Sequence, residues 1–215
     1  MDAMIPSPSE IASQVERAAS GDQALWGELL ERQRARLRKL VVLRLDSRLQ
    51  GRVDPSDVIQ EAFLDASRRL PDYAREPSPM PFYLWLRFLT GQKLMELHRR
   101  HLGAQARDVS REITLHRGPM PQATSAAIAA QLLGRQTSPS QAAIRAERKL
   151  RIQEALNRMD PIDREVLVLR HFEELSNAET AQALGLEKTA ASNRYIRALR
   201  RLKEILAGLP GFFDA

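Results

Sequence analysis

A basic segment near the C-terminal end of the chain has the composition of a helix that binds DNA. Residues 188–203 contain six lysines and arginines and no acidic residue. The short polar side chains of Ser192 and Asn193 precede most of these cations. Short polar groups can hydrogen-bond to base edges in the major groove, and the cations that follow can bind phosphates. The alternative is an ordinary surface helix whose charges are solvated.

The residues around this segment predict two short helices joined by a tight turn. Ser176 and Glu179 have the spacing of a capping box, which starts a helix. Gly185 follows where a chain leaving a helix often needs a positive φ. In the second helix, 188–202, apolar residues recur with helical spacing at Ala191, Tyr195, Ala198 and Leu202. The capping box, the glycine and the acid-free run coincide, which favours a helix-turn-helix over a solvated surface helix.

Hydrophobic periodicity and capping signals predict further helices upstream. We expect them from about Ile11 and over residues 23–45, 56–70, 82–101, 141–158 and 161–173. The helix at 56–70 follows Asp54-Pro55, a start signal, and exposes an acidic face. Residues 71–81 contain four prolines and predict an irregular loop. No segment has the alternating pattern of a strand.

The composition changes near residue 102, which indicates two domains. Residues 103–140 are rich in Ala, Gln, Ser, Pro and Gly and predict a linker with a short helix at 124–133. A flexible chain of this length spans about 30–40 Å. We therefore expect an all-α fold with two small helical domains. The boundaries are an N-terminal extension at 1–19, a first domain at 20–102, the linker at 103–140, a second domain at 141–208 and a tail at 209–215.

The bulk composition favours an anionic partner and excludes thiol chemistry. The net charge of the 215 residues is +6, which attracts polyanions. The chain has no cysteine, so disulfides, thiolate zinc sites and thiol nucleophiles are excluded. The N-terminus lacks an apolar signal core, and no run reaches the roughly 18 apolar residues of a membrane span. We expect a cytoplasmic protein with no membrane insertion.

Three strings, in this order, resemble bacterial sigma-70 family initiation factors of the extracytoplasmic-function (ECF) type. They are DPSDVIQEAFLDASRRL at 54–70, FYLWLRFLTGQKLMELHRRH at 82–101 and MDPIDREVLVLRHFEELSNAETAQALGL at 159–186. The resemblance implies a sigma region 2-like helical bundle and a sigma region 4-like helix-turn-helix domain. It also implies a function, promoter-specific transcription initiation, and two partners, RNA polymerase core enzyme and promoter DNA. An anti-sigma factor is left as a further candidate partner.

The resemblance implies three groups of site residues. The group that binds core polymerase is Asp57, Gln60, Glu61 and Phe63. The group that binds the −10 promoter element is Gln92, Lys93, Glu96, Arg99 and Arg100. The group that binds the −35 element is Lys188, Ser192, Asn193, Ile196, Arg197, Arg200 and Arg201. Base-edge contacts would fall to Ser192, Asn193, Ile196 and Arg197, and phosphate contacts to Arg200 and Arg201.

Elementary chemistry agrees with these roles. An acidic helix face suits an arginine-rich partner, because bidentate Arg–carboxylate pairs give register as well as attraction. Aromatic residues and cations, as found at 82–101, can compete with base stacking when DNA melts. Trp85 and Phe88 fall on the apolar stripe of that helix, so we expect them in the core rather than against bases.

Three other interpretations compete with the initiation factor. A helix-turn-helix regulator that binds DNA without polymerase leaves the acidic helix unexplained. A sigma mimic that only titrates an anti-sigma factor would be expected to lose its basic helix. An enzyme would need more than His98 and His101, which with Glu96 could bind a metal, because no second carboxylate–histidine unit, phosphate loop or nucleophile–base pair accompanies them. We expect no catalytic residues, no cofactor and no metal site.

Overall fold

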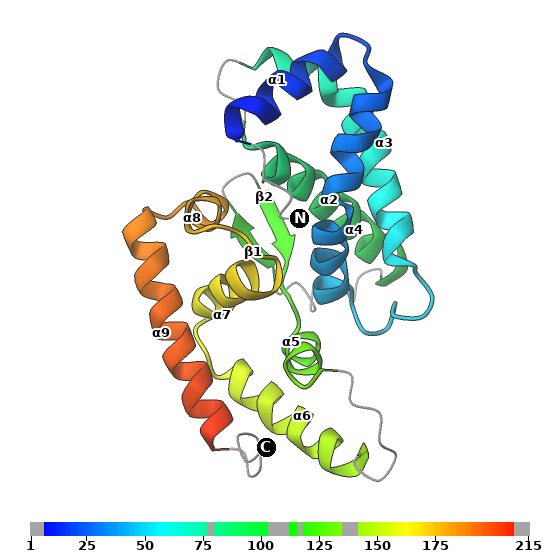
Figure 1. The fold of residues 1–215 in the computed structure, drawn as a ribbon. Coiled ribbons are helices and arrows are strands. Elements are labelled where there is room, and N and C mark those ends of the chain that lie inside the picture. Colours follow the sequence, from blue (N-terminus) through cyan, green and yellow to red (C-terminus); the bar gives the residue numbers. More distant parts are fainter. Residues whose placement is uncertain (1–6, 77–79, 103–111, 116–117, 135–141, 209–215) are drawn as a thin grey trace, which may run out of the picture.

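The computed structural model describes residues 7–76, 80–102, 112–115, 118–134 and 142–208. Its α-helices are α1 (Pro8–Ala19), α2 (Gln23–Arg44), α3 (Pro55–Arg75), α4 (Phe82–Leu102), α5 (Ser125–Leu132), α6 (Ala142–Asn157), α7 (Pro161–Leu167), α8 (Asn177–Leu184) and α9 (Lys188–Ala207). A π-helical turn, η3 (Val168–Phe172), continues α7. An antiparallel two-stranded ribbon pairs β1 (Glu112–Leu115) with β2 (Gly118–Pro121). The fold is all-α, as predicted, apart from this ribbon, which was not predicted (Figure 1).

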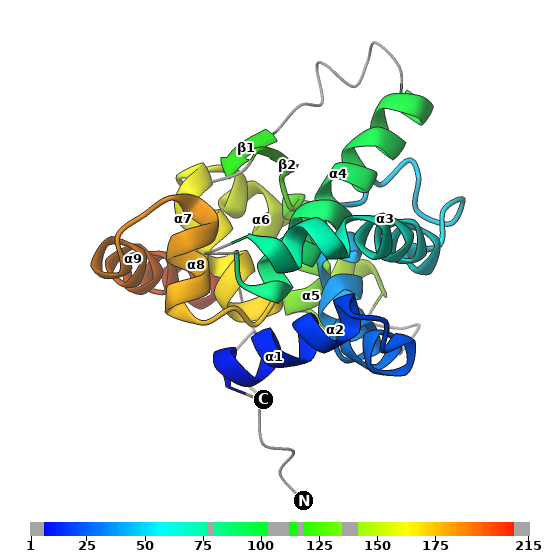
Figure 2. The same cartoon turned by 90° about the horizontal axis from the view of Figure 1, so that it is seen from above.

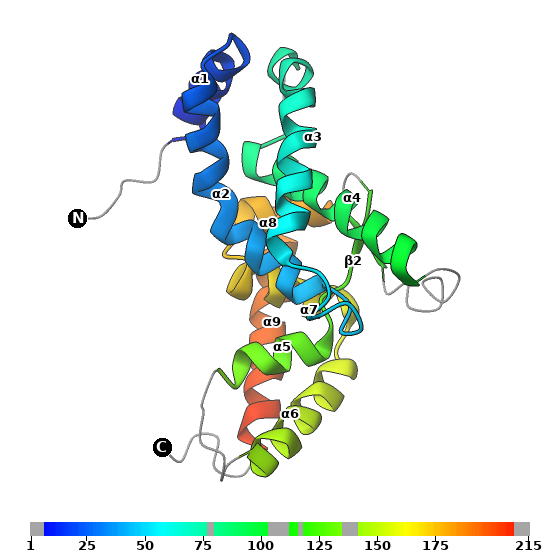
Figure 3. The same cartoon turned by 90° about the vertical axis from the view of Figure 1, so that its right-hand side faces the viewer.

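Helices α1–α4 pack around one apolar core. Figure 3 shows them gathered above α5 and α6. The core contains side chains that are shielded almost completely from solvent, among them Leu37, Leu40, Ile59, Leu86 and Leu89. Asp54 caps α3 by accepting a hydrogen bond from the backbone N–H of Ser56 at 2.8 Å, and Pro55 occupies the first turn. The predicted start of this helix is therefore confirmed.

The prediction of an irregular loop over residues 71–81 is wrong for its first five residues. Helix α3 continues through Pro71 to Arg75. Tyr73 lies in the core and stacks on Trp85 of α4, with ring centroids 4.2 Å apart and an interplanar angle of 18°. A proline inside a helix removes one backbone hydrogen bond. We attribute the continued helix to the packing of Tyr73, because burial of a large aromatic ring favours the folded turn.

Helices α8 and α9 form the predicted helix-turn-helix. The side chain of Ser176 accepts from the backbone N–H of Glu179 at 3.1 Å, and Glu179 accepts in return from the N–H of Ser176 at 2.8 Å. Gly185 ends α8 with a φ of +64°, so both the capping box and the left-handed turn are confirmed. The stripe of α9 faces inward: Ala191, Ala198 and Leu202 are buried, and Tyr195 packs beside them.

Part of the predicted linker is packed against both halves of the chain. Helix α5 confirms the short helix expected at 124–133. Met120 of β2 is buried against α4, where its Cε occupies the space that a Cβ on Gly91 would need. The backbone N–H of Thr124 donates to the carbonyl of Leu43 at 3.2 Å. Residues 118–134 therefore contribute apolar anchors that the composition of the segment did not indicate.

A buried cluster of four charged side chains joins the two halves. Arg44 of α2 donates to Glu165 of α7 and, through Nη2, to Glu173 at 2.6 Å. Arg87 of α4 donates from Nε to Glu173 at 2.8 Å. Arg44 also donates to the carbonyl of Pro121 in β2 at 2.7 Å. Burial opposes ionisation of Glu173, but the two arginines outweigh it and hold the pKa of this carboxyl below its usual range.

Further interactions surround this cluster on the same side of the bundle, where Figure 2 shows α7 and α8 beside α1–α4. The guanidinium of Arg36 lies 3.6 Å from the ring centroid of Tyr83 and 3.7 Å from a carboxylate oxygen of Glu179. Lys39 pairs with Glu174 at the exposed edge. The α2–α4 face contributes the cations and the C-terminal half contributes the carboxylates, so the two faces have complementary charge.

Candidate nucleic-acid and protein interfaces

The predicted polymerase-binding residues lie on the first three turns of α3. Asp57, Gln60 and Glu61 are exposed. Within the part of the chain that the structure describes, neither Asp57 nor Glu61 has an ion-pair partner. Phe63 differs from these three, because it is buried with 8% of its surface exposed and the guanidinium of Arg34 lies 5.2 Å from its ring centroid. Phe63 can support this face from inside the protein, but it is not part of the exposed surface.

An exposed leucine beside this face was missed by the sequence analysis. Leu64 is 56% exposed. Leu64 falls outside the helical spacing of the buried residues Phe63 and Ala66. An apolar residue outside the apolar stripe is the sequence signal that could have identified it. An exposed apolar side chain next to carboxylates suits a protein partner better than DNA, since phosphates repel carboxylates.

The predicted −10 residues line the second half of α4. Gln92, Arg99 and Arg100 are exposed, whereas Lys93 and Glu96 are half-buried. Lys93 pairs with Asp65 of α3 at 3.3 Å and lies 3.7 Å from Glu96, which also accepts from Arg100. Three of the five predicted residues therefore belong to one ion-pair chain. Trp85 lies in the core, as predicted, and Phe88 is half-buried against it.

The two histidines considered as metal ligands have other surroundings. The backbone N–H of Asp46 donates to Nε2 of His98 at 3.2 Å, so this nitrogen acts as an acceptor. Burial lowers the pKa of His98, Arg48 adds to this effect, and Asp46 opposes it. Over the described residues, no three side chains of the types that bind metals lie close enough together to hold an ion.

The acceptor role of His98 predicts a pH-dependent stability. The pKa is lower in the folded chain than the unfolded value of about 6.5. The unfolded state therefore binds more protons, and the contribution of neutral His98 is fully present above the unfolded pKa and is lost as the pH falls below it. His98→Gln keeps an acceptor and does not titrate. In urea unfolding, the stability advantage of the original chain over His98→Gln should shrink between about pH 7.5 and pH 5.5. A constant difference would contradict this interpretation.

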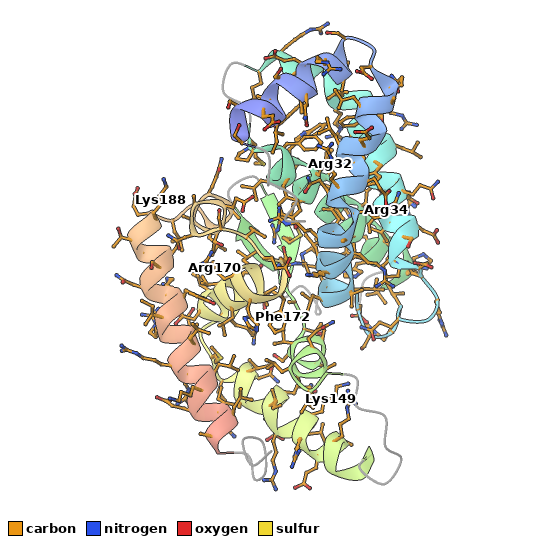
Figure 4. All side chains as sticks on the ribbon, in the orientation of Figure 1. Arg32, Arg34, Lys149, Arg170, Phe172 and Lys188 are labelled. Carbon is orange, nitrogen blue, oxygen red and sulfur yellow. The ribbon has the colours of Figure 1, made fainter. Side chains whose placement is uncertain are left out.

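The predicted −35 residues lie along the solvent-exposed side of α9. Lys188, at the outer N-terminal end of the helix in Figure 4, is exposed. So are Asn193, Ile196, Arg197, Arg200 and Arg201, whereas Ser192 is half-buried. Ile196 can contact a thymine methyl, and Asn193 can pair with an adenine through two hydrogen bonds. Arg201 pairs with Glu204 at 2.9 Å on the same helix.

An aspartate of α7 contacts this surface and was not predicted. Asp163 accepts from Arg197 through two hydrogen bonds, from Nε at 2.6 Å and from Nη2 at 2.7 Å. It also accepts from Nη1 of Arg194 at 2.6 Å. In the sequence, an acid in the first turn of a helix is explained by the helix dipole alone. The contact with α9 depends on the packing of α7 against α9 and has no signal in local spacing.

Two contacts hold α9 against the elements that precede it. Asn177 of α8 donates from Nδ2 to the carbonyl of Lys188 at 2.9 Å. The guanidinium of Arg170, in η3, lies 5.0 Å from the ring centroid of Tyr195. The first contact joins the start of α8 to the start of α9, and the second joins η3 to the middle of α9, so α9 is held against both preceding elements.

Known proteins share both halves of this arrangement. The family model for sigma-70 region 4 matches residues 149–202. The chain is 30% identical to the ECF RNA polymerase sigma factor SigD of Mycobacterium tuberculosis over 190 residues, which are 88% of this chain and 81% of that protein. It is 28% identical to the RNA polymerase sigma factor NccH of Alcaligenes xylosoxydans xylosoxydans over 205 residues, 93% of this chain and 96% of that protein. The chain belongs to the ECF RNA polymerase sigma factors.

A solved structure agrees with the fold. The structure of CnrH in complex with the cytosolic domain of CnrY has a TM-score of 0.53 and 24% sequence identity, and the match covers 91% of this chain and 96% of that chain. At this identity the likeness concerns the fold alone. Across the described residues, no helix combines the length and the apolar character that crossing a bilayer requires.

Proposed function

We propose that this chain binds core RNA polymerase and directs transcription initiation at promoters of a specific sequence. Its membership of the ECF sigma factors supports this function. The observation that carries the proposal is the exposed face of α3 formed by Asp57, Gln60 and Glu61, whose two carboxylates have no ion-pair partner among the described residues. A DNA-binding regulator has no need of such a face, and it lies on a different element from the basic reading helix α9. Promoter DNA is the second partner, and polymerase and DNA place the site of action in the cytoplasm.

The residues have separate roles in this proposal. The acidic face of α3 binds a surface of polymerase that is rich in arginine. The exposed end of α4, with Gln92 and Arg99, binds the −10 element, and Asn193 and Arg197 of α9 read bases of the −35 element. Arg200 and Arg201 bind phosphates, which adds affinity without sequence information.

Co-elution with purified core RNA polymerase tests the proposal against the regulator. We expect the chain to elute with the core enzyme and the resulting complex to retain promoter DNA. A chain that binds DNA fragments but elutes apart from the core enzyme would be a helix-turn-helix regulator. The chain alone and the core enzyme alone are the controls.

We propose further that the two halves, residues 20–102 and 141–208, separate when they bind a promoter. Two elements that lie two turns apart on DNA are about 70 Å from one another. A compact chain of this length has a radius of gyration of only about 17 Å. The buried contacts of Arg44 hold the halves together, so these contacts have to open before both elements can be bound at once.

A crosslink between the halves tests this separation. The chain has no cysteine, so Lys39→Cys with Glu174→Cys introduces a single reactive pair at the exposed edge of the contact. A short bismaleimide should join the pair and lower promoter-dependent transcription at least about tenfold, because the barrier to opening is then covalent. The uncrosslinked double variant and the two single variants treated with the reagent are the controls. Equal transcription by the crosslinked and uncrosslinked chains would show that the halves do not separate.

A further inference from the structure

Asp163 is placed to act on a side chain that is itself exposed to solvent. Its own side chain is 9% exposed, whereas that of Arg197 is 61% exposed. The backbone N–H of Asp163 donates to the side chain of Asp160 at 3.2 Å, which fixes the first turn of α7. The carboxylate is thus a rigid acceptor at the base of a long and otherwise mobile arginine on the reading side of α9.

The two hydrogen bonds use only one edge of the Arg197 guanidinium. Nε and one hydrogen of Nη2 face the carboxylate. Two of the five N–H groups are used, which leaves three. The remaining Nη1–Nη2 edge points away from Asp163. This is the edge that can donate two parallel hydrogen bonds to O6 and N7 of a guanine.

We infer that Asp163 is a positioning residue that orients Arg197 to read a guanine in the −35 element. The inference rests on the proposed function, since it requires α9 to lie in the major groove. A free arginine samples many rotamers, and binding in one of them loses that freedom. An arginine already held by a rigid carboxylate loses less, so its contact with the correct base is favoured over phosphate contacts that a flexible arginine also makes.

The negative charge of Asp163 strengthens the discrimination. A carboxylate near the DNA backbone is repelled by phosphates, which lowers affinity for every sequence alike. Correct pairing of Arg197 with guanine offsets this repulsion, and a wrong base does not. The Asp163–Arg197 ion pair therefore lowers the affinity for all DNA sequences and raises the preference for guanine at one −35 position.

A purely structural role for Asp163 makes a different prediction. Arg194 is half-buried and shares the Oδ1 atom of Asp163, so the same carboxylate also ties α7 to α9. If joining α7 to α9 were the only role of Asp163, removing its carboxylate would weaken binding to all promoter sequences by the same factor. A change in base preference is the readout that separates the two roles.

The test uses holoenzyme assembled from core polymerase and the full chain, with promoter fragments that vary at each −35 base. We expect Asp163→Asn to lower the preference for guanine at one position about tenfold, with binding to the poorest sequence unchanged or tighter. Arg197→Ala should lose the same preference, and Asp163→Asn should add nothing in that background. Asp163→Glu keeps the charge but displaces the carboxylate by one methylene, and it should also lose preference. Asp163→Glu takes the place of Asp163→Asn in the test if the asparagine variant does not fold.

Three results would overturn the inference. If Arg197→Ala loses the preference but both Asp163 variants keep it, Arg197 reads the base without help, and the proposed function stands. If both Asp163 variants weaken all sequences equally, the carboxylate has only a structural role. If the holoenzyme forms but prefers no −35 sequence, or if no holoenzyme forms, the proposed function fails and the inference fails with it.

Discussion

Arg44→Ala should lower the free energy of unfolding by about 3–5 kcal/mol. Of the partners that the described residues give Glu165, the substitution leaves only Arg87, at 3.7 Å. It also removes one of the two arginines that bind Glu173. Both carboxylates are buried between the halves, and an uncompensated buried charge is costly. Urea unfolding followed by far-ultraviolet circular dichroism measures the change.

Arg48→Ala is the matched control for this prediction. Arg48 lies four residues after Arg44 and pairs with Asp46 at 2.9 Å, but its side chain is exposed. Asp46 is nearly buried, but it keeps the hydrogen bond from the backbone N–H of residue 48, and water can replace the exposed guanidinium, so this variant should lose much less stability than Arg44→Ala. If Arg44→Ala loses no more than Arg48→Ala, the four-charge cluster does not stabilise the contact between the halves.

Glu61→Arg should weaken binding to core RNA polymerase by several kcal/mol, which is a loss of about a hundredfold or more. The residue is exposed on the acidic face of α3 and has no ion-pair partner in the described part of the chain, so the fold should be unaffected. Placing a cation against an arginine-rich surface replaces attraction with repulsion. Titration of labelled chain with core enzyme measures the affinity.

Glu154→Arg makes the same change of charge at a distant exposed position on α6. It should bind the core enzyme as the original chain does, which separates a specific contact from an effect of net charge. Equal losses in the two variants would indicate non-specific electrostatics. Unchanged affinity in Glu61→Arg would remove this face from the polymerase interface.

Local signals in the sequence were sufficient for most of the helices. The capping box at Ser176, the glycine at 185 and the stripe of α9 each depend on residues within a few positions of one another, and all three are confirmed. The ends of helices were less predictable. Pro71 is a local signal against a helix, and the packing of Tyr73 on Trp85, twelve positions further along the chain, overrides it.

The contact between the halves could not be predicted from local patterns. Arg44 belongs to a basic stretch that reads as a solvated surface, and its partners Glu165 and Glu173 are 121 and 129 residues away in the sequence. Burial of such a charge is favourable only when the partners and the surrounding hydrogen bonds are in place. The ribbon of β1 and β2 also depends on tertiary contacts, since the carbonyl of Pro121 in β2 accepts a hydrogen bond from Arg44.

The residues of the candidate site also fall into those that the sequence could identify and those that it could not. Resemblance and helical spacing identified the exposed residues of α3, α4 and α9, and their roles stay predictions. They did not identify Asp163, because its contact with Arg197 spans 34 positions and two helices. They also did not separate Phe63, which is buried, from its exposed neighbours on α3.

Run-off transcription with purified core RNA polymerase is the most direct test of the central claim. Genomic promoter fragments are transcribed with the core enzyme alone and with the core enzyme plus the full chain. If the chain is a promoter-specific initiation factor, discrete run-off products should appear from a small subset of fragments only when the chain is present. Products that are the same with and without the chain, or fragments that are bound by the chain but never transcribed, would contradict the account.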